Sequence, residues 1–345
     1  MKPRSELMPA SAYARVIRPL LPPEVFLPRQ AHLWKVLLHL ALVGAGYAML
    51  RHSGLWWTSL VCSTFIGHSL GCLAFLAHDV SHHSVVSSRT GRRGLELLLW
   101  GLNVISPTLW RRIHNQTHHH ETNTVKDPDR QFRKSEQSML TQAYNRLLYP
   151  SHNTWHGNPL PLFHFVTYIL RHLITALLPG RATLPIVTHK PEYAARHRMA
   201  ILAELLVIVL LQWLIWLAVG QRWSAFVWAS PVPILVASAV VMMYVFTNHF
   251  LNPLCEHTDP LIGSTSVIVP RWMDWLHDNF SYHTEHHLFP GMNPKWYPEV
   301  SRLLQQHFSE RYNRLPLSEA WRRLWQRDEF IQETIPAPAD SAECR

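Results

Sequence analysis

The chain has 345 residues, 48% of them hydrophobic, and a formal net charge of +9 at pH 7. This composition fits either a large globular enzyme or a membrane protein, so the distribution of the apolar residues decides between them. The four cysteines include no CxxC pair, and the sequence therefore indicates neither a disulfide framework nor a thiolate zinc site. We expect any bound metal to be held by other side chains.

The N-terminal residues 1–31 are polar, basic and rich in proline. They lack the short apolar core and the small-residue cleavage site of a secretory signal. We expect them to form an arm at the cytoplasmic surface of a membrane.

Four apolar stretches follow, and each approaches or exceeds the roughly 20 residues that cross a bilayer. They cover about 32–50, 55–77, 200–220 and 225–247. We interpret all four as transmembrane helices.

Two further apolar stretches, 95–109 and 160–178, predict helices at the membrane interface. The first is short, and the second carries Arg171 and His172 at its centre. Ionisable groups are costly at the middle of a membrane, which argues against a fifth span.

The distribution of cations predicts the orientation. The turns 51–54 and 221–224 hold one Arg each, whereas most other Lys and Arg lie on the opposite side. Because cytoplasmic flanks collect Lys and Arg, both termini are expected in the cytoplasm, with a bacterial inner membrane as the location. The expected fold class is an all-α, multi-pass integral membrane protein with four transmembrane helices, interfacial helices and a cytoplasmic helical cap. Within the C-terminal segment 305–345, residues 310–330 predict a basic amphipathic helix.

Histidines gather in three clusters just beyond the ends of the predicted spans. The clusters are HDVSHH at 78–83, HNQTHHHETN at 114–123 and HTEHH at 283–287. By contrast, we interpret His68, inside the second span, as a helix-packing residue, and His277 as an ordinary interfacial polar residue. If the chain crosses the membrane twice between the second and third clusters, all three clusters lie at the cytoplasmic face and can converge.

Helical spacing indicates how these side chains point, because residues three and four apart share a face. His114 is expected to stack on His118, while His119 points about a quarter of a turn away. In the third cluster one helix can serve two neighbouring ions. Two metal ions in one pocket are therefore the simplest arrangement, and imidazole ligands suit zinc, copper, iron or nickel. A redox pair that activates O2 fits best, which favours iron.

The three clusters with four spans around them resemble the membrane fatty acid desaturase family, whose non-haem di-iron centre is held by three histidine boxes. HNQTHHHETNTVKDPD resembles the second box, and NFSYHTEHHLFPGM resembles the third box of acyl-chain desaturases. The resemblance covers about residues 55–304, and the predicted domain is 32–304. It implies that the iron ligands are His78, His82, His114, His118, His119, His283, His286 and His287.

The family often adds an Asn and a His shortly after the last span. FTNHFLNPLCEHTD offers Asn252 with His257, or Asn248 with His249. The wider gap looks closer to the family's pattern, so we assign His257 as a ninth ligand and keep His249 as the alternative. Further residues are expected to surround and orient the ligands. They are His83, His120, Asp79, Glu121, Asp127, Asp129, Asn252 and Glu285.

The implied reaction removes two hydrogens from adjacent carbons of an alkyl chain, with O2, two electrons and two protons giving two waters. The sequence contains no cytochrome b5 HPGG stretch and no flavin fingerprint, so we expect an external donor of the ferredoxin or cytochrome b5 type. The substrate is expected on a lipid, coenzyme A or an acyl carrier protein, and nucleic acid is not an expected partner. Hydroxylase, acetylenase and carotenoid ketolase or hydroxylase activities remain alternatives on the same scaffold. A metal transporter would place its ligands at mid-membrane, and a zincin would need HExxH, which is absent.

Overall fold

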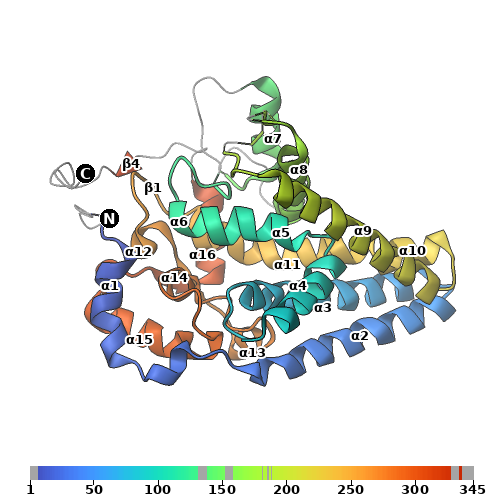
Figure 1. Cartoon of the computed structure of the whole chain (residues 1–345), viewed down its shortest axis with the longest axis horizontal. Coiled ribbons are helices and arrows are strands. Elements are labelled where there is room, and N and C mark those ends of the chain that lie inside the picture. The colour runs from blue at the N-terminus through green and yellow to red at the C-terminus, as the bar shows by residue number, and fades with distance from the viewer. Residues whose placement is uncertain are drawn as a thin grey trace.

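The computed structural model describes residues 7–130, 138–151, 158–180, 182–184, 186–187, 189–327 and 334–335. These residues are mainly helical (Figure 1). The α-helices are α1 (Ala10–Ile17), α2 (Leu33–His52), α3 (Trp56–Ser81), α4 (Arg89–Leu102), α5 (Pro107–Trp110), α6 (His119–Glu121), α7 (Met139–Leu148), α8 (His164–Leu177), α9 (Ala195–Ala218), α10 (Trp223–Ala229), α11 (Pro231–His249), α12 (Pro260–Gly263), α13 (Arg271–Leu276), α14 (His283–Leu288), α15 (Tyr297–His307) and α16 (Leu317–Gln326).

Other elements are short. The 3-10 helices are Arg18–Leu20, Pro23–Phe26, Gln30–His32, Leu160–Phe163 and Pro294–Trp296, and a π-helix covers Arg111–His118. Two parallel strand pairs, β1 (Leu254–Cys255) with β4 (Thr334–Ile335) and β2 (Ser266–Ile268) with β3 (Arg314–Pro316), complete the structure; Leu254 pairs with Thr334 and Ser266 with Arg314. The expectation of an all-α chain therefore holds apart from these few strand residues.

Long helices form an elongated bundle in which α3 packs against α2, α4 and α11 (Figure 1). A glycine lies where α3 and α11 come close together. A Cβ added at Gly67 of α3 would lie 2.5 Å from the Cβ of Val236 and 2.6 Å from the carbonyl oxygen of Pro233. Small residues let helix backbones approach in this way inside membranes, where packing replaces the hydrophobic effect.

Five helical stretches are long and apolar enough to cross a membrane. They are Leu33–His52, Trp56–Ser81, Leu160–Leu177, Ala195–Ala218 and Trp223–His249. Four of them coincide with the predicted spans, and the fifth is the stretch that the sequence assigned to the interface because of Arg171 and His172. These helices mark the chain as a membrane protein.

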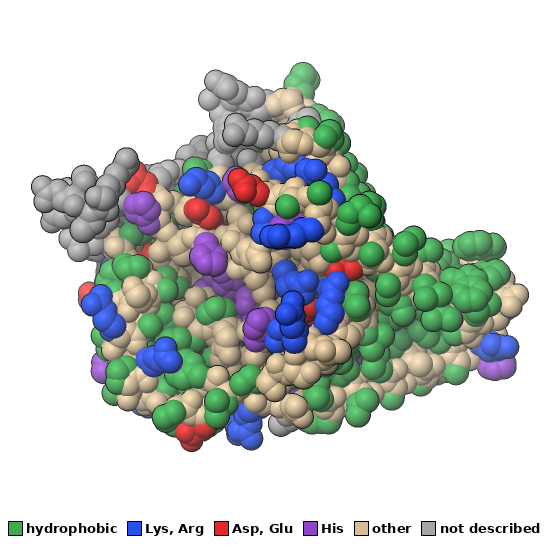
Figure 2. All heavy atoms as spheres, in the orientation of Figure 1, with side chains coloured by type: hydrophobic (Ala, Val, Ile, Leu, Met, Phe, Trp, Pro, Cys, Tyr) green, Lys and Arg blue, Asp and Glu red, His purple; other side chains and the backbone are tan. Residues whose placement is uncertain are grey.

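Large apolar side chains cover the outside of the bundle. Figure 2 shows them gathered at the right-hand end, where Figure 1 places α2, α9 and α10, whereas most Lys and Arg lie nearer the centre. Phe65 and Leu206 are 71% and 72% exposed. A contiguous apolar surface of this kind marks a membrane or protein contact, and here it surrounds the helices that are long enough to span.

A helical cap lies at the other end of the bundle. In it α1 packs against α14 and α15 around a core that includes Tyr13, Ile17 and Leu304. The Tyr13 hydroxyl donates to Asp259 at 3.0 Å, and Arg311 pairs with the same carboxylate at 2.7 Å. The described part of the predicted N-terminal arm therefore packs on the cap instead of lying apart from it.

The C-terminal helix is shorter than expected. The sequence predicted one helix over 310–330, but Arg314–Pro316 is strand β3 and the helix α16 begins at Leu317. Pro316 explains the boundary. Proline has no backbone N–H and so interrupts the hydrogen bonds inside a helix, but it is tolerated where a helix begins.

Candidate metal centre

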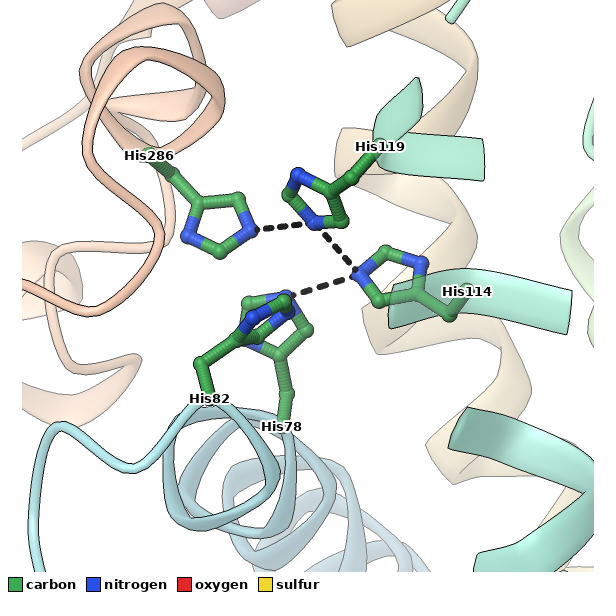
Figure 3. A group of neighbouring side chains, drawn as sticks. All are labelled: His78, His82, His114, His119 and His286. Atoms are coloured by element: carbon green, nitrogen blue, oxygen red, sulfur yellow. Dashed lines mark hydrogen bonds between the residues drawn. The ribbon is translucent and has the colours of Figure 1, made fainter. Parts of the chain in front are cut away.

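The histidine clusters, which lie far apart in the sequence, meet where α3, the π-helix, α11 and α14 come together. Figure 3 shows the first group, in which five imidazoles from three segments point toward one another. Their ligand atoms all lie within 4.8 Å of one another. This group is His78, His82, His114, His119 and His286.

A second group lies directly beside the first, and its four members are buried. It is His118, His249, His283 and His287, again with ligand atoms within 4.8 Å. The ring of His119 in the first group stacks on that of His287 in the second, with centroids 4.6 Å apart. The two groups therefore share one pocket.

The π-helix divides the second cluster between the two groups. An α-helix puts residues four apart on one face, and the rings of His114 and His118 do stack at 5.1 Å. A π-helix bonds i to i+5, however, and this wider turn brings Nε2 of His119 to 3.3 Å from Nε2 of His114. His114 and His119 therefore share the first group, whereas His118 belongs to the second.

Helix α14 contributes to both groups. His283 and His287, four residues apart, point into the second group, where their Nε2 atoms are 3.1 Å apart. His286 points into the first group, and its Nε2 lies 3.0 Å from that of His119. This one short helix thus connects the two groups.

Oxygen acceptors lie against the outer nitrogens of the rings. Asp79 lies 3.0 Å from Nδ1 of His78, and Asp127 lies 2.9 Å from Nδ1 of His118. A carboxylate can only accept, so each Nδ1 carries a hydrogen, and Nε2 of the neutral ring has its lone pair available for a metal ion.

The same arrangement recurs at three other rings, with neutral acceptors. The carbonyl oxygen of Gly263 lies 3.3 Å from Nδ1 of His249. The Thr122 hydroxyl, 3.2 Å from Nδ1 of His287, donates to the carbonyl oxygen of His118, so its lone pairs face the ring. Tyr297 lies 3.1 Å from Nδ1 of His286 and donates to Met292. In all five rings the lone pair of Nε2 is directed inward.

These residues fit metal ions. Two nitrogens each about 2.1 Å from one ion, at angles of about 90 to 110°, lie roughly 3.0 to 3.4 Å apart. The contact between Nε2 of His78 and Nε2 of His114 measures 3.1 Å. Among the described residues, Nε2 of His82 and Nε2 of His118 are buried and have no hydrogen-bond partner. A metal ion would satisfy these nitrogens, whereas facing lone pairs without a cation would be unfavourable.

Burial keeps most of these imidazoles neutral. It lowers the pKa of six of them well below the ordinary 6.5, and the neighbouring histidines lower it further. A neutral imidazole is the form that binds metal. The six are His82, His114, His119, His283, His286 and His287.

His118 differs from them. Burial lowers its pKa, but the carboxylates of Asp127 and Asp129 outweigh this effect and raise the pKa to about 9. Burial also raises the pKa of Asp129 to about 6. The same carboxylates that favour a proton on His118 favour a cation beside it.

One predicted ligand is misplaced. His257 is exposed and belongs to neither histidine group of the described residues, whereas His249 at the end of α11 lies 2.7 Å from His283 between Nε2 atoms. The sequence favoured His257 because of its spacing from Asn252. In the structure the chain runs through β1 before it reaches His257, which therefore lies outside the pocket. His249, the alternative, is the histidine of this segment that lies in the second group.

The residues predicted to surround the ligands divide into two sets. Asp79, Asp127 and Asp129 contact histidines of the two groups. Others do not. His83 and His120 are exposed, and Glu121 pairs with Lys126 and Thr124. Glu285 contacts Ser266 and Tyr312, and Asn252 contacts Thr265 and the backbone of α11.

The sequence did not predict three of the residues that contact the outer nitrogens of the rings: Tyr297, Thr122 and Gly263. Thr122 follows His118 by four residues, a spacing that would have placed it near the boxes. Tyr297 and the carbonyl of Gly263 carry no signal, because only the packing of α15 and α12 around α14 brings them to the rings.

Glu204 of α9 positions the second cluster. Its buried carboxylate accepts from the backbone N–H of Thr108 at 2.9 Å and from its hydroxyl at 2.5 Å, and it also contacts Ser106 and Arg93. Thr108 lies in the first turn of α5, where free N–H groups favour a negative charge. This contact fixes the start of the helical segment that continues into the π-helix.

An apolar cavity opens on both histidine groups. His78, His114, His118, His249 and His283 line it on one side. Aromatic and aliphatic side chains form the rest of the wall, including Phe75, Trp100, Trp110, Phe165, Val241 and Phe280. A second apolar cavity adjoins it, since Phe165 and Val241 line both.

The model of the family described as fatty acid desaturase matches residues 54–318. This chain belongs to that family. Among curated proteins, this chain is 25% identical to an acyl-lipid (9-3)-desaturase of Borago officinalis, over 78% of this chain and 64% of that protein. It is also 26% identical to Delta(8)-fatty-acid desaturase 2 of Arabidopsis thaliana, over 73% and 59%.

This chain is also 26% identical to a Delta 8-(E)-sphingolipid desaturase of Lachancea kluyveri, over 65% of this chain and 43% of that protein. The chain thus spans about three fifths of the length of the first curated relatives that it matches. The match nevertheless includes all three histidine clusters and α11, which together supply both groups.

Proposed function

We propose that this chain is an O2-dependent fatty acyl desaturase that introduces a double bond into an alkyl chain at a di-iron centre. The supporting observation is the pair of adjacent histidine groups, nine imidazoles in all, that open on an apolar cavity. A non-polar substrate and a redox metal pair would meet at this boundary. The family and the names of the relatives agree with this proposal.

His78, His82, His114, His119 and His286 would hold one iron ion, and His118, His249, His283 and His287 the other. Imidazole alone does not select iron over zinc or copper. Iron is preferred because the reaction needs an oxidant, and zinc has no redox chemistry. When bound, the ions would allow hydrogens to be taken from unactivated carbons, with O2 as the oxidant and two electrons and two protons supplied from outside.

The protein's own side chains would select the carbons that react. Phe75 stacks on Phe280 with centroids 4.3 Å apart, and Trp110 stacks on His114 at 4.6 Å. These rings form an apolar wall immediately beside the proposed ligands. An alkyl chain held against it would exclude water and fix which carbons face the metals.

We propose four membrane spans, formed by α2, α3, α9 and α10 with α11, and a cytoplasmic centre. The C-terminal ends of α3 and α11 carry ligands of the same pocket, so they lie on one side of the membrane. The chain between them must then cross an even number of times, which α9 and α11 provide. The stretch Leu160–Leu177 would lie at the interface, as the buried Arg171 favours.

The partners proposed are an external electron donor of the ferredoxin or cytochrome b5 type and a substrate carried on a lipid, coenzyme A or an acyl carrier protein. A net charge of +9 would attract an acidic donor and anionic headgroups. Two of the relatives are named for lipid-linked chains, an acyl lipid and a sphingolipid, which makes an acyl lipid the first substrate to test.

The deciding experiment compares His249→Ala with His257→Ala. Each variant is expressed in bacteria, total fatty acids are analysed by gas chromatography and mass spectrometry, and iron is measured in the purified protein. We expect new unsaturated acids with the wild type and His257→Ala, and neither these products nor full iron content with His249→Ala. Hydroxylated or keto products in place of alkenes would overturn the desaturase assignment in favour of an oxygenase on the same scaffold.

A further inference from the structure

A third set of metal-ligating side chains lies within the helix bundle, apart from both histidine groups. It is formed by His68 and Cys72 of α3 and by His277, which directly follows α13. Their ligand atoms lie within 4.8 Å of one another, as do those of each histidine group. Cys72 and His277 are buried, and His68 is partly exposed.

The two imidazoles face each other through their Nε2 atoms, which are 3.2 Å apart. The Cys72 sulfur lies 3.8 Å from the other nitrogen of His68. Two nitrogens on one tetrahedral ion would be roughly 3.3 Å apart, and a nitrogen and a sulfur roughly 3.6 Å apart. The imidazole pair already has this spacing. The sulfur contacts Nδ1 of His68 and lies within 4.8 Å of the ligand nitrogens, so it would move toward Nε2 by up to roughly 1.2 Å to join the same ion.

Tyr244 of α11 lies against the outer nitrogen of His277. Its hydroxyl is 2.7 Å from Nδ1, and the two rings are nearly perpendicular. With Nδ1–H donated to this hydroxyl, the lone pair of Nε2 faces His68 and Cys72, as in the rings that surround the catalytic pocket. A further buried imidazole, His39 of α2, has an Nδ1 without a hydrogen-bond partner among the described residues.

We propose that His68, Cys72 and His277 form a third metal site, which binds a thiophilic cation of the zinc or monovalent copper class. Two imidazoles and a thiol are soft ligands, and a thiolate suits these ions better than oxygen ligands would. Cys72 binds as the thiolate, and its proton passes to the solvent on binding. The fourth position of a tetrahedral ion is open for water or His39.

The position of the site gives it a structural role. Cys72 precedes the ligand His78 by six residues on α3, and His277 precedes the ligand His283 by six residues. A cation held by both would connect the helix of the first histidine cluster to the segment that leads into the third. The cation would hold these two segments together and would not contact the reacting carbons.

Cobalt is a suitable probe, because cobalt bound to a thiolate gives an intense near-ultraviolet charge-transfer band that cobalt bound to histidines alone does not give. Metal-free protein is titrated with Co2+ beyond two equivalents. We expect the band in the wild type and in Cys62→Ser, a control on the same helix outside the cluster. We expect its loss in Cys72→Ser and its weakening in His277→Gln. A band that survives Cys72→Ser, or no band in the wild type, would overturn the proposal.

A second measurement needs no variant. Zn2+ should slow the alkylation of Cys72 in the wild type by about tenfold when free zinc is about ten times the dissociation constant, because the unoccupied fraction falls by that factor. Cys62 in the same molecule should react at an unchanged rate. Equal rates at Cys72 with and without zinc would contradict the site.

The experiment also separates this site from the proposed di-iron centre. A double variant, His118→Ala with His119→Ala, should lose the unsaturated products but keep the cobalt band. Loss of the band with the products would assign the sulfur ligand to the catalytic pocket and overturn an independent third site.

Discussion

The hydrogen bond that Nδ1–H of His118 donates to Asp127 should contribute measurably to the iron affinity of the proposed centre. Asp127 is fully buried, and its Oδ1 lies 2.9 Å from Nδ1 of His118. A hydrogen bond to a charged group contributes about 1.5 to 3 kcal/mol, and each 1.4 kcal/mol is tenfold in affinity, so its loss corresponds to roughly 10- to 150-fold. Asp129 stands 3.4 Å from the same nitrogen and keeps part of the interaction. We therefore expect Asp127→Asn to weaken iron binding by roughly tenfold to a hundredfold, toward the lower value.

The assay is competition for iron between purified protein and a chelator of known affinity, with product formation measured in parallel. Glu121→Gln is the matched control, because Glu121 belongs to the same cluster but pairs with Lys126 instead of a histidine. Asp127 also accepts from the backbone N–H of Asn123 at 2.8 Å, so a folded variant must be confirmed by its unfolding temperature. Unchanged iron affinity in a folded Asp127→Asn, or an equal loss in Glu121→Gln, would refute the reasoning.

Three further outcomes are expected. Val241→Phe should fill space where the two apolar cavities adjoin and shift the products toward shorter chains at unchanged iron content; an unchanged product profile would contradict a substrate that occupies both cavities. Glu204→Leu removes the buried acceptor of Arg93 and of the Thr108 hydroxyl. The Arg93 side chain is 35% exposed and keeps Glu96 at 3.8 Å, so the unfolding free energy should fall by about 1 to 3 kcal/mol, seen as a lower unfolding temperature than that of Glu204→Gln. Metal-free protein should lose stability as the pH falls below 6.5, by about 1.4 kcal/mol per pH unit for each buried histidine outside the spanning helices that has a lowered pKa, because only the unfolded chain takes up those protons. His118, with a pKa raised to about 9, acts in the opposite sense: its stabilisation is complete below pH 6.5 and is lost as the pH rises toward 9. A flat melting temperature between pH 7 and 5.5 would contradict the burial of neutral rings.

Local features of the sequence predicted the helices that could span a membrane and the histidine clusters at their ends. Span length follows from the thickness of the bilayer, so an apolar run such as 55–77 identifies its helix without any tertiary information. The helix continues to Ser81 and carries His78 into the pocket. The second and third clusters were also recognised, since four histidines in ten residues are a strong local signal.

The division of the histidines into two groups was not predictable in the same way. The spacing of His114 and His118 indicates a shared face only if the helix is an α-helix, and a π-helix assigned them to different groups. The sequence offered both His249 and His257 near the end of a span and favoured His257. Only the direction of the chain after α11 distinguished them, because β1 and the turn before it carry His257 to the surface.

By itself, therefore, the sequence determined that this protein is a helical membrane protein with clustered histidines, because hydrophobic length and residue chemistry are local properties. The tertiary structure decided which nitrogens converge, which oxygens orient them, and that His68, Cys72 and His277 meet at all. Several of these contacts join residues far apart in the chain: His119 and His286 are 167 positions apart, and His68 and His277 are 209. No local pattern encodes them, since they exist only where separate helices pack against one another.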